Sequence, residues 1–113
     1  MAVLIDQFED QAAEAVSFLK ALANEPRLLM LCHLAEGKEL SVGDLAQRVR
    51  LSQSALSQHL AKLREQNLVI TRKDAQTVFY SVSDPKALQL LSLLHDLFCP
   101  ELGRAAATKS NRS

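Results

Sequence analysis

Polar side chains gather along the segment 53–65, where the apolar residues Leu56, Leu60 and Leu63 recur every three or four positions. This spacing predicts an amphipathic helix whose apolar side faces a core. The side chains left facing outward or sideways are Gln53, Ser54, Ser57, Gln58, His59, Lys62 and Arg64. Amide and hydroxyl groups can exchange hydrogen bonds with base edges in the DNA major groove, and Lys and Arg neutralise phosphates. We interpret the Gln and Ser side chains as base-reading, and His59 as a phosphate or base contact, although a solvated helix with no ligand also fits.

Two cysteines, Cys32 and Cys99, are the other residues with distinctive chemistry. A thiol reacts as its thiolate, which nearby positive charge favours. His95 precedes Cys99 by four residues and so shares a helix face with it. The negative end of a helix dipole would oppose a thiolate at Cys99. The residues alone therefore leave two interpretations: a reactive thiol, or, for Cys32, a buried core residue, as unpaired cysteines often are.

The polar helix has a helical neighbour before it. Ser41 is a candidate N-cap for a helix that ends near Val49, and Asp44 in its first turn suits the positive helix end. Ser52 can cap the polar helix itself. Two short helices joined by a tight turn, the second one polar and basic, are the outline of a DNA-reading helix-turn-helix.

A β-hairpin is predicted beyond the second helix, with a short strand 69–71 and a longer strand 77–82 of alternating pattern. No glycine lies between them, so we expect the loop 72–76 to be longer and more open than a two-residue turn. Arg72, Lys73 and Gln76 lie in this loop and are candidate DNA contacts, although charged residues are also common in solvated turns. A hairpin at this place makes the motif a winged helix.

Three further helices are expected around the motif. Asn24 and Asp84 are candidate N-caps, and each is followed closely by a proline that the first turn tolerates. The last helix is apolar around most of its circumference and needs burial on two sides. The expected fold is mainly α with a small β-hairpin, a winged helix-turn-helix of order ααααββα. We expect it to form a homodimer through the first and last helices.

Length and charge bound the function further. The 113 residues carry no net charge, with 13 basic and 13 acidic side chains. Segment 48–73 nevertheless sums to 6 − 1 = +5, whereas segment 1–25 sums to 1 − 5 = −4. Such a basic patch favours a nucleic-acid partner over a pure protein-interaction module. We expect one domain over 1–102 and a mobile tail over 103–113.

Several classes of protein are disfavoured by what the sequence lacks. No apolar run approaches the ~20 residues that span a bilayer, and acidic residues follow the first five residues at once, unlike a signal peptide. We therefore expect a cytoplasmic protein. Catalytic motifs such as Cys-x-x-Cys, a Gly-rich phosphate loop and His-Glu-x-x-His are absent, so we expect no enzyme and no cofactor.

The chain closely resembles the ArsR/SmtB family of small winged-helix repressors. The blocks that carry the resemblance are ALANEPRLLMLCHL, ELSVGDLAQRVRLSQSALSQHLAKLREQNLV and TRKDAQTVFYSV, in that order and at matching spacing. They cover about 18–100 of the chain. The resemblance implies a homodimer that binds an inverted-repeat operator, represses transcription and dissociates when an inducer arrives.

Two metal sites common in the family are not matched. One uses a cysteine pair on the third helix, where this chain has Ser41 and Gly43. The other uses four ligands on the last helix, of which Asp84 alone remains; Lys86, Leu97 and Pro100 occupy the other three positions.

Cys32 and Cys99, in the contexts LCHL and LFCP, instead resemble the dithiol branch of the family, the BigR, SqrR and HlyU types. This resemblance implies a switch in which persulfides, polysulfides or oxidants link the two cysteines. Two alternatives stay open: a metal-responsive repressor with Cys32, His33, His95 and Cys99 as ligands, and a regulator with no inducer.

Overall fold

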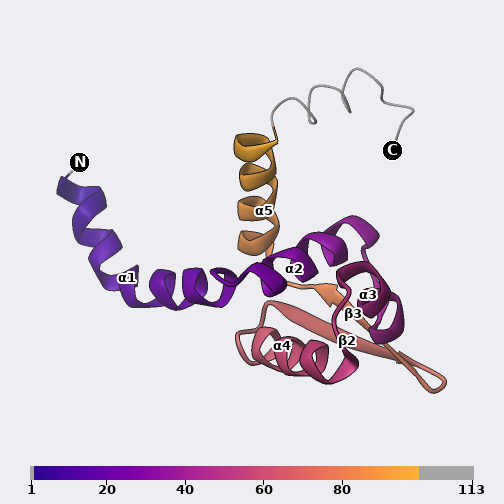
Figure 1. Ribbon diagram of the computed structural model, residues 1–113. Coiled ribbons are helices and arrows are strands. Elements are labelled where there is room, and N and C mark those ends of the chain that lie inside the picture. Colours follow the sequence, from indigo (N-terminus) through magenta and orange to yellow (C-terminus); the bar gives the residue numbers. More distant parts are fainter. Residues whose placement is uncertain (1, 100–113) are drawn as a thin grey trace. The chain divides into compact units, whose positions relative to one another are not determined.

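The computed structural model describes residues 2–99, with side chains from Ile5 onward; the tail predicted over 103–113 lies outside the described residues. The elements are α1 (Ala2–Leu22), α2 (Glu25–Gly37), β1 (Leu40–Ser41), α3 (Val42–Val49), α4 (Gln53–Glu65), β2 (Val69–Asp74), β3 (Thr77–Val82) and α5 (Pro85–Phe98) (Figure 1). The chain divides after Ser83 into two compact units. The first unit holds α1 to β3, and the second holds α5.

All four predicted N-caps are confirmed. The side chains of Asn24, Ser41, Ser52 and Asp84 each accept a hydrogen bond from a backbone N–H two or three residues later, at 2.8–3.1 Å. A cap of this kind stabilises its helix by about 1 kcal/mol because it satisfies a donor that has no partner within the helix. The caps therefore fix where α2, α3, α4 and α5 begin.

The hairpin is longer and tighter than the sequence predicts. Strand β2 runs on to Asp74, which pairs with Thr77, so only Ala75 and Gln76 form the loop. The expectation of a longer, open loop was wrong. Ala75 adopts φ 56°, the left-handed region that a two-residue hairpin turn requires. That conformation costs a non-glycine residue roughly 1–2 kcal/mol, which the six-residue ladder between the strands offsets.

The winged-helix fold is confirmed, with one strand that the sequence did not reveal. Leu40 and Ser41 pair with Tyr80 and Phe79, so the sheet has three strands in the order β1-β3-β2. A two-residue strand has too few positions to show an alternating pattern. It attaches the start of α3 to the middle of β3.

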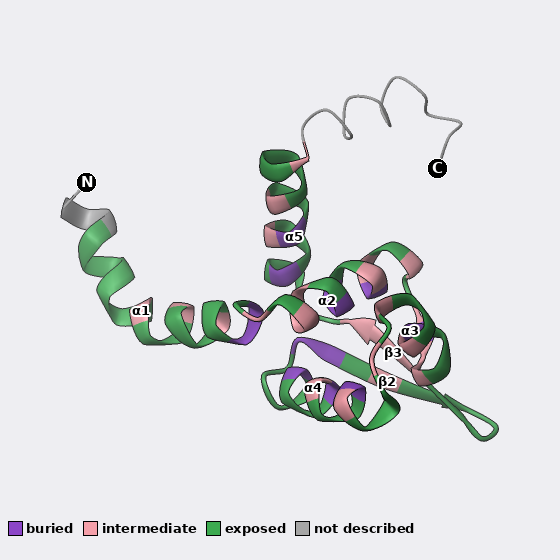
Figure 2. Ribbon diagram, in the orientation of Figure 1, coloured by how far each residue is buried: buried purple, intermediate pink, exposed green. Residues whose placement is uncertain are grey.

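Buried residues gather where α2, α3 and α4 meet the base of the hairpin, whereas the outer half of the hairpin is exposed (Figure 2). The largest fully buried side chains are Met30, Leu31, Leu34, Leu45, Leu56, Leu60, Leu63, Leu68 and Val69. Burying one such side chain contributes roughly 1.5–3 kcal/mol. This core holds the helix-turn-helix as a rigid body.

The first and last helices each carry large apolar side chains on their surfaces. On α1, Ile5, Phe8, Val16 and Leu19 are exposed. On α5, Ala87 and Leu91 are buried, whereas Leu88, Leu93, Leu97 and Phe98 are exposed, Phe98 by 78%. No helix in the described part of the chain has the length and hydropathy to cross a bilayer.

Candidate nucleic-acid interface

Helix α4 is held by an apolar stripe on one side. Leu56, Leu60 and Leu63 are at most 1% exposed, and they lie four and three residues apart, which places them on one helix face. The Ser52 hydroxyl caps the helix by accepting from the Ala55 N–H at 3.1 Å. The burial of these three leucines and the cap at Ser52 hold α4 in place, so its opposite face points away from the core.

That opposite face carries the polar residues that the sequence singled out. Gln53, Ser54, Ser57, Gln58, Lys62 and Arg64 are exposed, and His59 is half-buried. Among the described residues, the side chains of the four Gln and Ser residues make no hydrogen bond. These donors and acceptors stand at the N-terminal half of α4, the part of a recognition helix that reaches bases. Their placement suits readout in the major groove.

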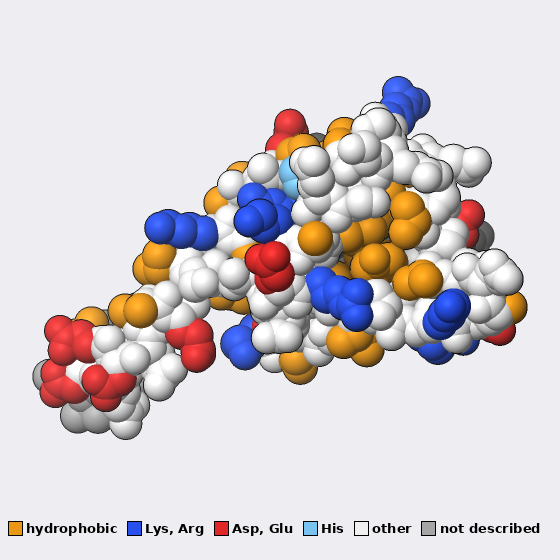
Figure 3. Space-filling view, turned by 90° about the horizontal axis from the view of Figure 1, so that it is seen from below, with side chains coloured by type: hydrophobic (Ala, Val, Ile, Leu, Met, Phe, Trp, Pro, Cys, Tyr) orange, Lys and Arg blue, Asp and Glu red, His pale blue; other side chains and the backbone are white. Residues whose placement is uncertain are grey.

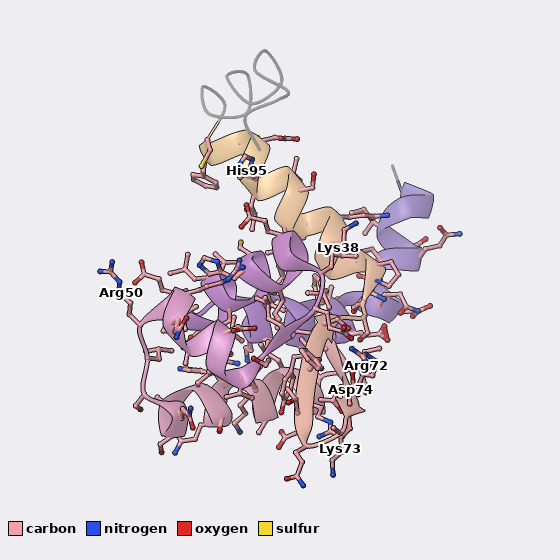
Figure 4. The ribbon with its side chains drawn as sticks, turned by 90° about the vertical axis from the view of Figure 1, so that its right-hand side faces the viewer. Lys38, Arg50, Arg72, Lys73, Asp74 and His95 are labelled. Atoms are coloured by element: carbon pink, nitrogen blue, oxygen red, sulfur yellow. The ribbon has the colours of Figure 1, made fainter. Side chains whose placement is uncertain are left out.

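The turn between α3 and α4 adds two cations. Arg48 lies in the last turn of α3 and is exposed. Arg50 ends the helix in the left-handed conformation, with φ 57° and ψ 43°, and its N–H donates to the Ala46 carbonyl at 2.9 Å. The Arg50 side chain extends outward at the edge of the unit (Figure 4). Both guanidinium groups lie near the start of α4, where phosphate contacts would position the helix.

The wing is attached to the body by an arginine. Arg72 donates from Nε and Nη2 to the two carboxylate oxygens of Glu39, both at 2.8 Å. Its guanidinium also lies over the Phe79 ring, 5.0 Å from the centroid. The hydrogen bonds to Arg72 hold the pKa of the Glu39 carboxyl below its usual value, and those to Glu39 raise the pKa of Arg72. A planar fork matched to a carboxylate restricts orientation, so this exposed pair adds to the sheet pairing in holding β2 near the segment before β1.

The sequence interpretation missed this role. It placed Arg72 among the DNA contacts and did not single out Glu39 or Phe79. Glu39 and Arg72 are 33 residues apart, and no local pattern relates them. The predicted DNA contact by Arg72 stays a prediction. The charge of Arg72 is already matched by Glu39, and Asp74 Oδ2 lies 4.0 Å from Arg72 Nη1.

Lys73 and Gln76 are the wing residues left for a partner. Lys73 is exposed on β2, and Gln76 is exposed in the two-residue loop. Figure 4 shows Lys73 in the outer part of the hairpin, where it stands between Arg72 and Asp74 along β2. Within residues 5–99, the Lys73 ammonium takes part in no ion pair. It is therefore the wing cation best placed to meet a phosphate.

Charge is separated along the first unit. Acidic side chains gather toward the N-terminal end of α1, whereas Lys and Arg are spread over the rest of the unit (Figure 3). The α1 acids are Asp6, Glu9, Asp10 and Glu14, all exposed. A polyanion would meet the helix-turn-helix and avoid this end of α1.

The two cysteines belong to different units. Cys32 lies on α2 and is exposed, so its alternative interpretation as a buried core residue was wrong. Cys99 follows α5 and is half-buried, and its N–H donates to the His95 carbonyl at 2.8 Å. The described part of the chain holds no group of three or more His, Cys, Asp or Glu residues suited to a metal ion.

Comparison with known proteins decides the family. Residues 19–71 match the model of the bacterial regulatory protein arsR family. The chain is 55% identical to the transcriptional activator HlyU of Vibrio cholerae over 95 residues, which cover 84% of this chain and 87% of that protein. The chain belongs to the ArsR family.

Two solved structures of ArsR-type regulators share the fold. Reduced HlyU from Vibrio cholerae N16961 has a TM-score of 0.77 at 56% sequence identity, covering 82% of this chain and 97% of that one. The transcriptional repressor BigR from Xylella fastidiosa has a TM-score of 0.78 at 40% identity, covering 83% and 95%. As a member of the ArsR family, this protein is a DNA-binding transcriptional regulator. The exposed face of α4 is the part of the fold whose chemistry suits that role.

Proposed function

We propose that this regulator is a homodimeric repressor without enzymatic activity. It binds an inverted-repeat operator and is released by reactive sulfur species or oxidants through Cys32 and Cys99. The observation that carries the DNA-binding part is the exposed N-terminal half of α4, whose Gln and Ser side chains have no intramolecular partners in the described chain. BigR is a repressor, which supports repression, whereas HlyU carries the name of a transcriptional activator; both are regulators of transcription.

Exposed apolar side chains support dimerisation through α1 and α5. Each helix presents four large apolar residues to solvent. Contiguous apolar surface of this kind usually marks a protein contact. A two-fold dimer would also place two α4 helices for half-sites about 34 Å apart.

Three observations support the thiol switch. The chain holds only two cysteines, Cys32 is exposed, and a relative of 56% identity has been solved specifically in its reduced form. An exposed thiol is accessible to an oxidant dissolved in water. Linking Cys32 to Cys99 would tie α2, which supports the DNA-binding motif, to the residue that ends α5.

The chemistry balances with either class of inducer. A thiolate attacks a polysulfide sulfur, expels a shortened polysulfide and becomes a persulfide. The second thiolate then attacks the cysteine sulfur of that persulfide, forms the disulfide and releases hydrosulfide. With peroxide, the first thiolate becomes a sulfenic acid, and the second displaces water from it. A direct disulfide requires the two Cα atoms within about 7 Å of each other.

The test is fluorescence anisotropy on a labelled inverted-repeat operator, with reduced protein and with protein treated with polysulfide. We expect treatment to weaken binding by about 100-fold, equivalent to about 2.7 kcal/mol of coupling. Cys32→Ser and Cys99→Ser should each bind the operator like the reduced wild type and ignore polysulfide. The double variant is the matched control.

Two outcomes would overturn the switch. One is release of either single variant by polysulfide. The other is release of the untreated wild type by low concentrations of zinc, which would favour a metal-responsive repressor. Intact mass spectrometry of the treated wild type reports the product, because a disulfide lowers the mass by two hydrogens and each retained sulfur raises it by one sulfur atom.

A further inference from the structure

An open cleft of about 440 Å³ lies between α1, α2 and the C-terminal end of α4. Its lining is Ala13, Val16, Ser17, Lys20, Ala21, Arg27, Lys62 and Gln66. All of these residues belong to the first unit. The Ser17 hydroxyl donates to Gln66 Oε1 at 3.2 Å, which joins α1 to α4 at this cleft. The volume is in the range of about 300–1,000 Å³ that small-molecule sites occupy.

Some of the residues that line the cleft are cationic and others are apolar. Lys20, Arg27 and Lys62 come from three different helices, and no lining residue is acidic. Three cations converging without a carboxylate repel one another unless an anion joins them. Ala13, Val16 and Ala21 supply the apolar part of the lining from α1, where Val16 borders the exposed apolar residues that we propose for the dimer contact. In Figure 3, Lys and Arg side chains are seen near the place where α1 meets the rest of the unit.

Arg27 supplies a second, independent observation. Its Nε is buried, and within the described residues no atom accepts a hydrogen bond from it. A buried donor on a charged group is costly when it has no partner, so native structures rarely leave one. Because this Nε is buried, an anion in the cleft reaches it only if the Arg27 side chain turns toward the anion, and the unmet hydrogen bond of the Nε–H favours that turn.

We propose that the cleft binds a small organic anion, with one acidic group against Lys20, Arg27 and Lys62 and an apolar body along α1. The lining includes neither cysteine and none of the base-reading candidates of α4, so the proposal goes beyond the proposed function. A phosphate of bound DNA is the competing occupant. The apolar part of the lining and the concave shape favour a small molecule, since recognition helices approach DNA by their N-terminal ends and not their C-terminal ends.

The probes are phenyl phosphate, inorganic phosphate and benzyl alcohol, titrated separately into reduced full-length protein without DNA. Nitrogen–proton correlation spectra follow the backbone and the Arg27 Nε–H. We expect phenyl phosphate to bind saturably, at least about tenfold tighter than either of the other two, because only it offers both charge and an apolar body. The Arg27 Nε–H resonance should shift downfield as it gains an acceptor.

The variants are Lys20→Gln and Arg27→Gln, with Lys86→Gln on α5 as the charge-matched control. Lys20 is exposed, so its variant should fold even if Arg27→Gln does not. We expect the Lys20 variant to weaken phenyl phosphate about fivefold or more, as the loss of a charged partner does, and the Lys86 variant to leave it unchanged.

Three results would overturn the proposal. They are no saturable binding of phenyl phosphate at millimolar concentrations, shifts confined to residues outside the cleft, and equal weakening by the Lys86 variant. If the probes fail and Lys20→Gln instead weakens DNA binding, the cleft belongs to the DNA footprint.

Discussion

The wing offers a sharp test, because two neighbouring cations on β2 have different surroundings. Arg72 is held by both oxygens of Glu39 at 2.8 Å, whereas Lys73 is exposed and outside any ion pair of the described residues. Each phosphate contact contributes about −0.9 to the slope of log affinity against log salt. If Lys73 meets one phosphate per subunit, Lys73→Gln should make the slope of a dimer shallower by about 1.8.

The matched variants separate contact from anchoring. Arg72→Gln should change the slope much less than Lys73→Gln, because the Arg72 charge is already neutralised by Glu39. Glu39→Gln should release Arg72 for DNA and steepen the slope, by up to about 0.9 per subunit. Arg72→Gln would thus leave the salt slope nearly unchanged and Glu39→Gln would steepen it, whereas Lys73→Gln would make it shallower.

The assay is fluorescence anisotropy with operator and with random duplex, at four or more salt concentrations for each variant. Lys73→Gln should weaken both duplexes alike, since phosphates carry no sequence information. A slope change for Arg72→Gln equal to that for Lys73→Gln would refute the reasoning. So would a Glu39→Gln slope indistinguishable from that of the wild type.

Three further predictions concern readout, the core and pH. Gln58→Ala should reduce the preference for operator over random duplex by about 1–3 kcal/mol, as loss of a good base contact does. Competition binding measures this preference, and an equal loss of affinity for both duplexes would show that Gln58 does not read bases. Leu60 is 1% exposed, so Leu60→Ala should lower the free energy of unfolding by about 2–5 kcal/mol. Urea denaturation should show a lower midpoint with an unchanged dependence of that free energy on urea concentration. A smaller loss would mean that this side chain does not anchor α4. The pKa of Glu39 is lowered below 4.5, so its ion pair stabilises the wing above pH 4.5 and is lost as the pH falls through the folded-state value. Carboxyl NMR of Arg72→Gln should show the Glu39 pKa returning toward 4.5, and an unchanged titration would exclude Arg72 as the cause.

Local patterns were sufficient for the helices and for the family. A cap acts within three residues of its own position, so Asn24, Ser41, Ser52 and Asp84 were recognisable from spacing alone. The stripe Leu56, Leu60 and Leu63 likewise predicted which face of α4 is buried, and so which side chains are left outside. The helix-turn-helix and its base-reading candidates followed from these local features.

Tertiary structure decided how the wing is built and attached. Glu39 finds Arg72 across 33 residues, and Leu40–Ser41 pairs with Phe79–Tyr80, contacts that no local spacing encodes. The two-residue turn at Ala75 contradicts local turn preference because the ladder between β2 and β3 outweighs the cost of one positive φ.

The same distinction applies to the cysteines and the cleft. Cys32 lies among apolar residues in sequence, yet it is exposed, because a helix buries only the faces that neighbours cover. Lys20 and Arg27 are close in sequence, on either side of the α1–α2 junction, whereas Lys62 lies 62 − 27 = 35 residues beyond Arg27, and only the packing of α4 against α1 and α2 brings it to the same cleft. The sequence by itself determined the helices, their caps and the polar face of α4, since these depend on neighbours within a few residues. Long-range packing alone decided the third strand, the anchored wing and the cationic cleft, since each joins side chains that only folding brings together.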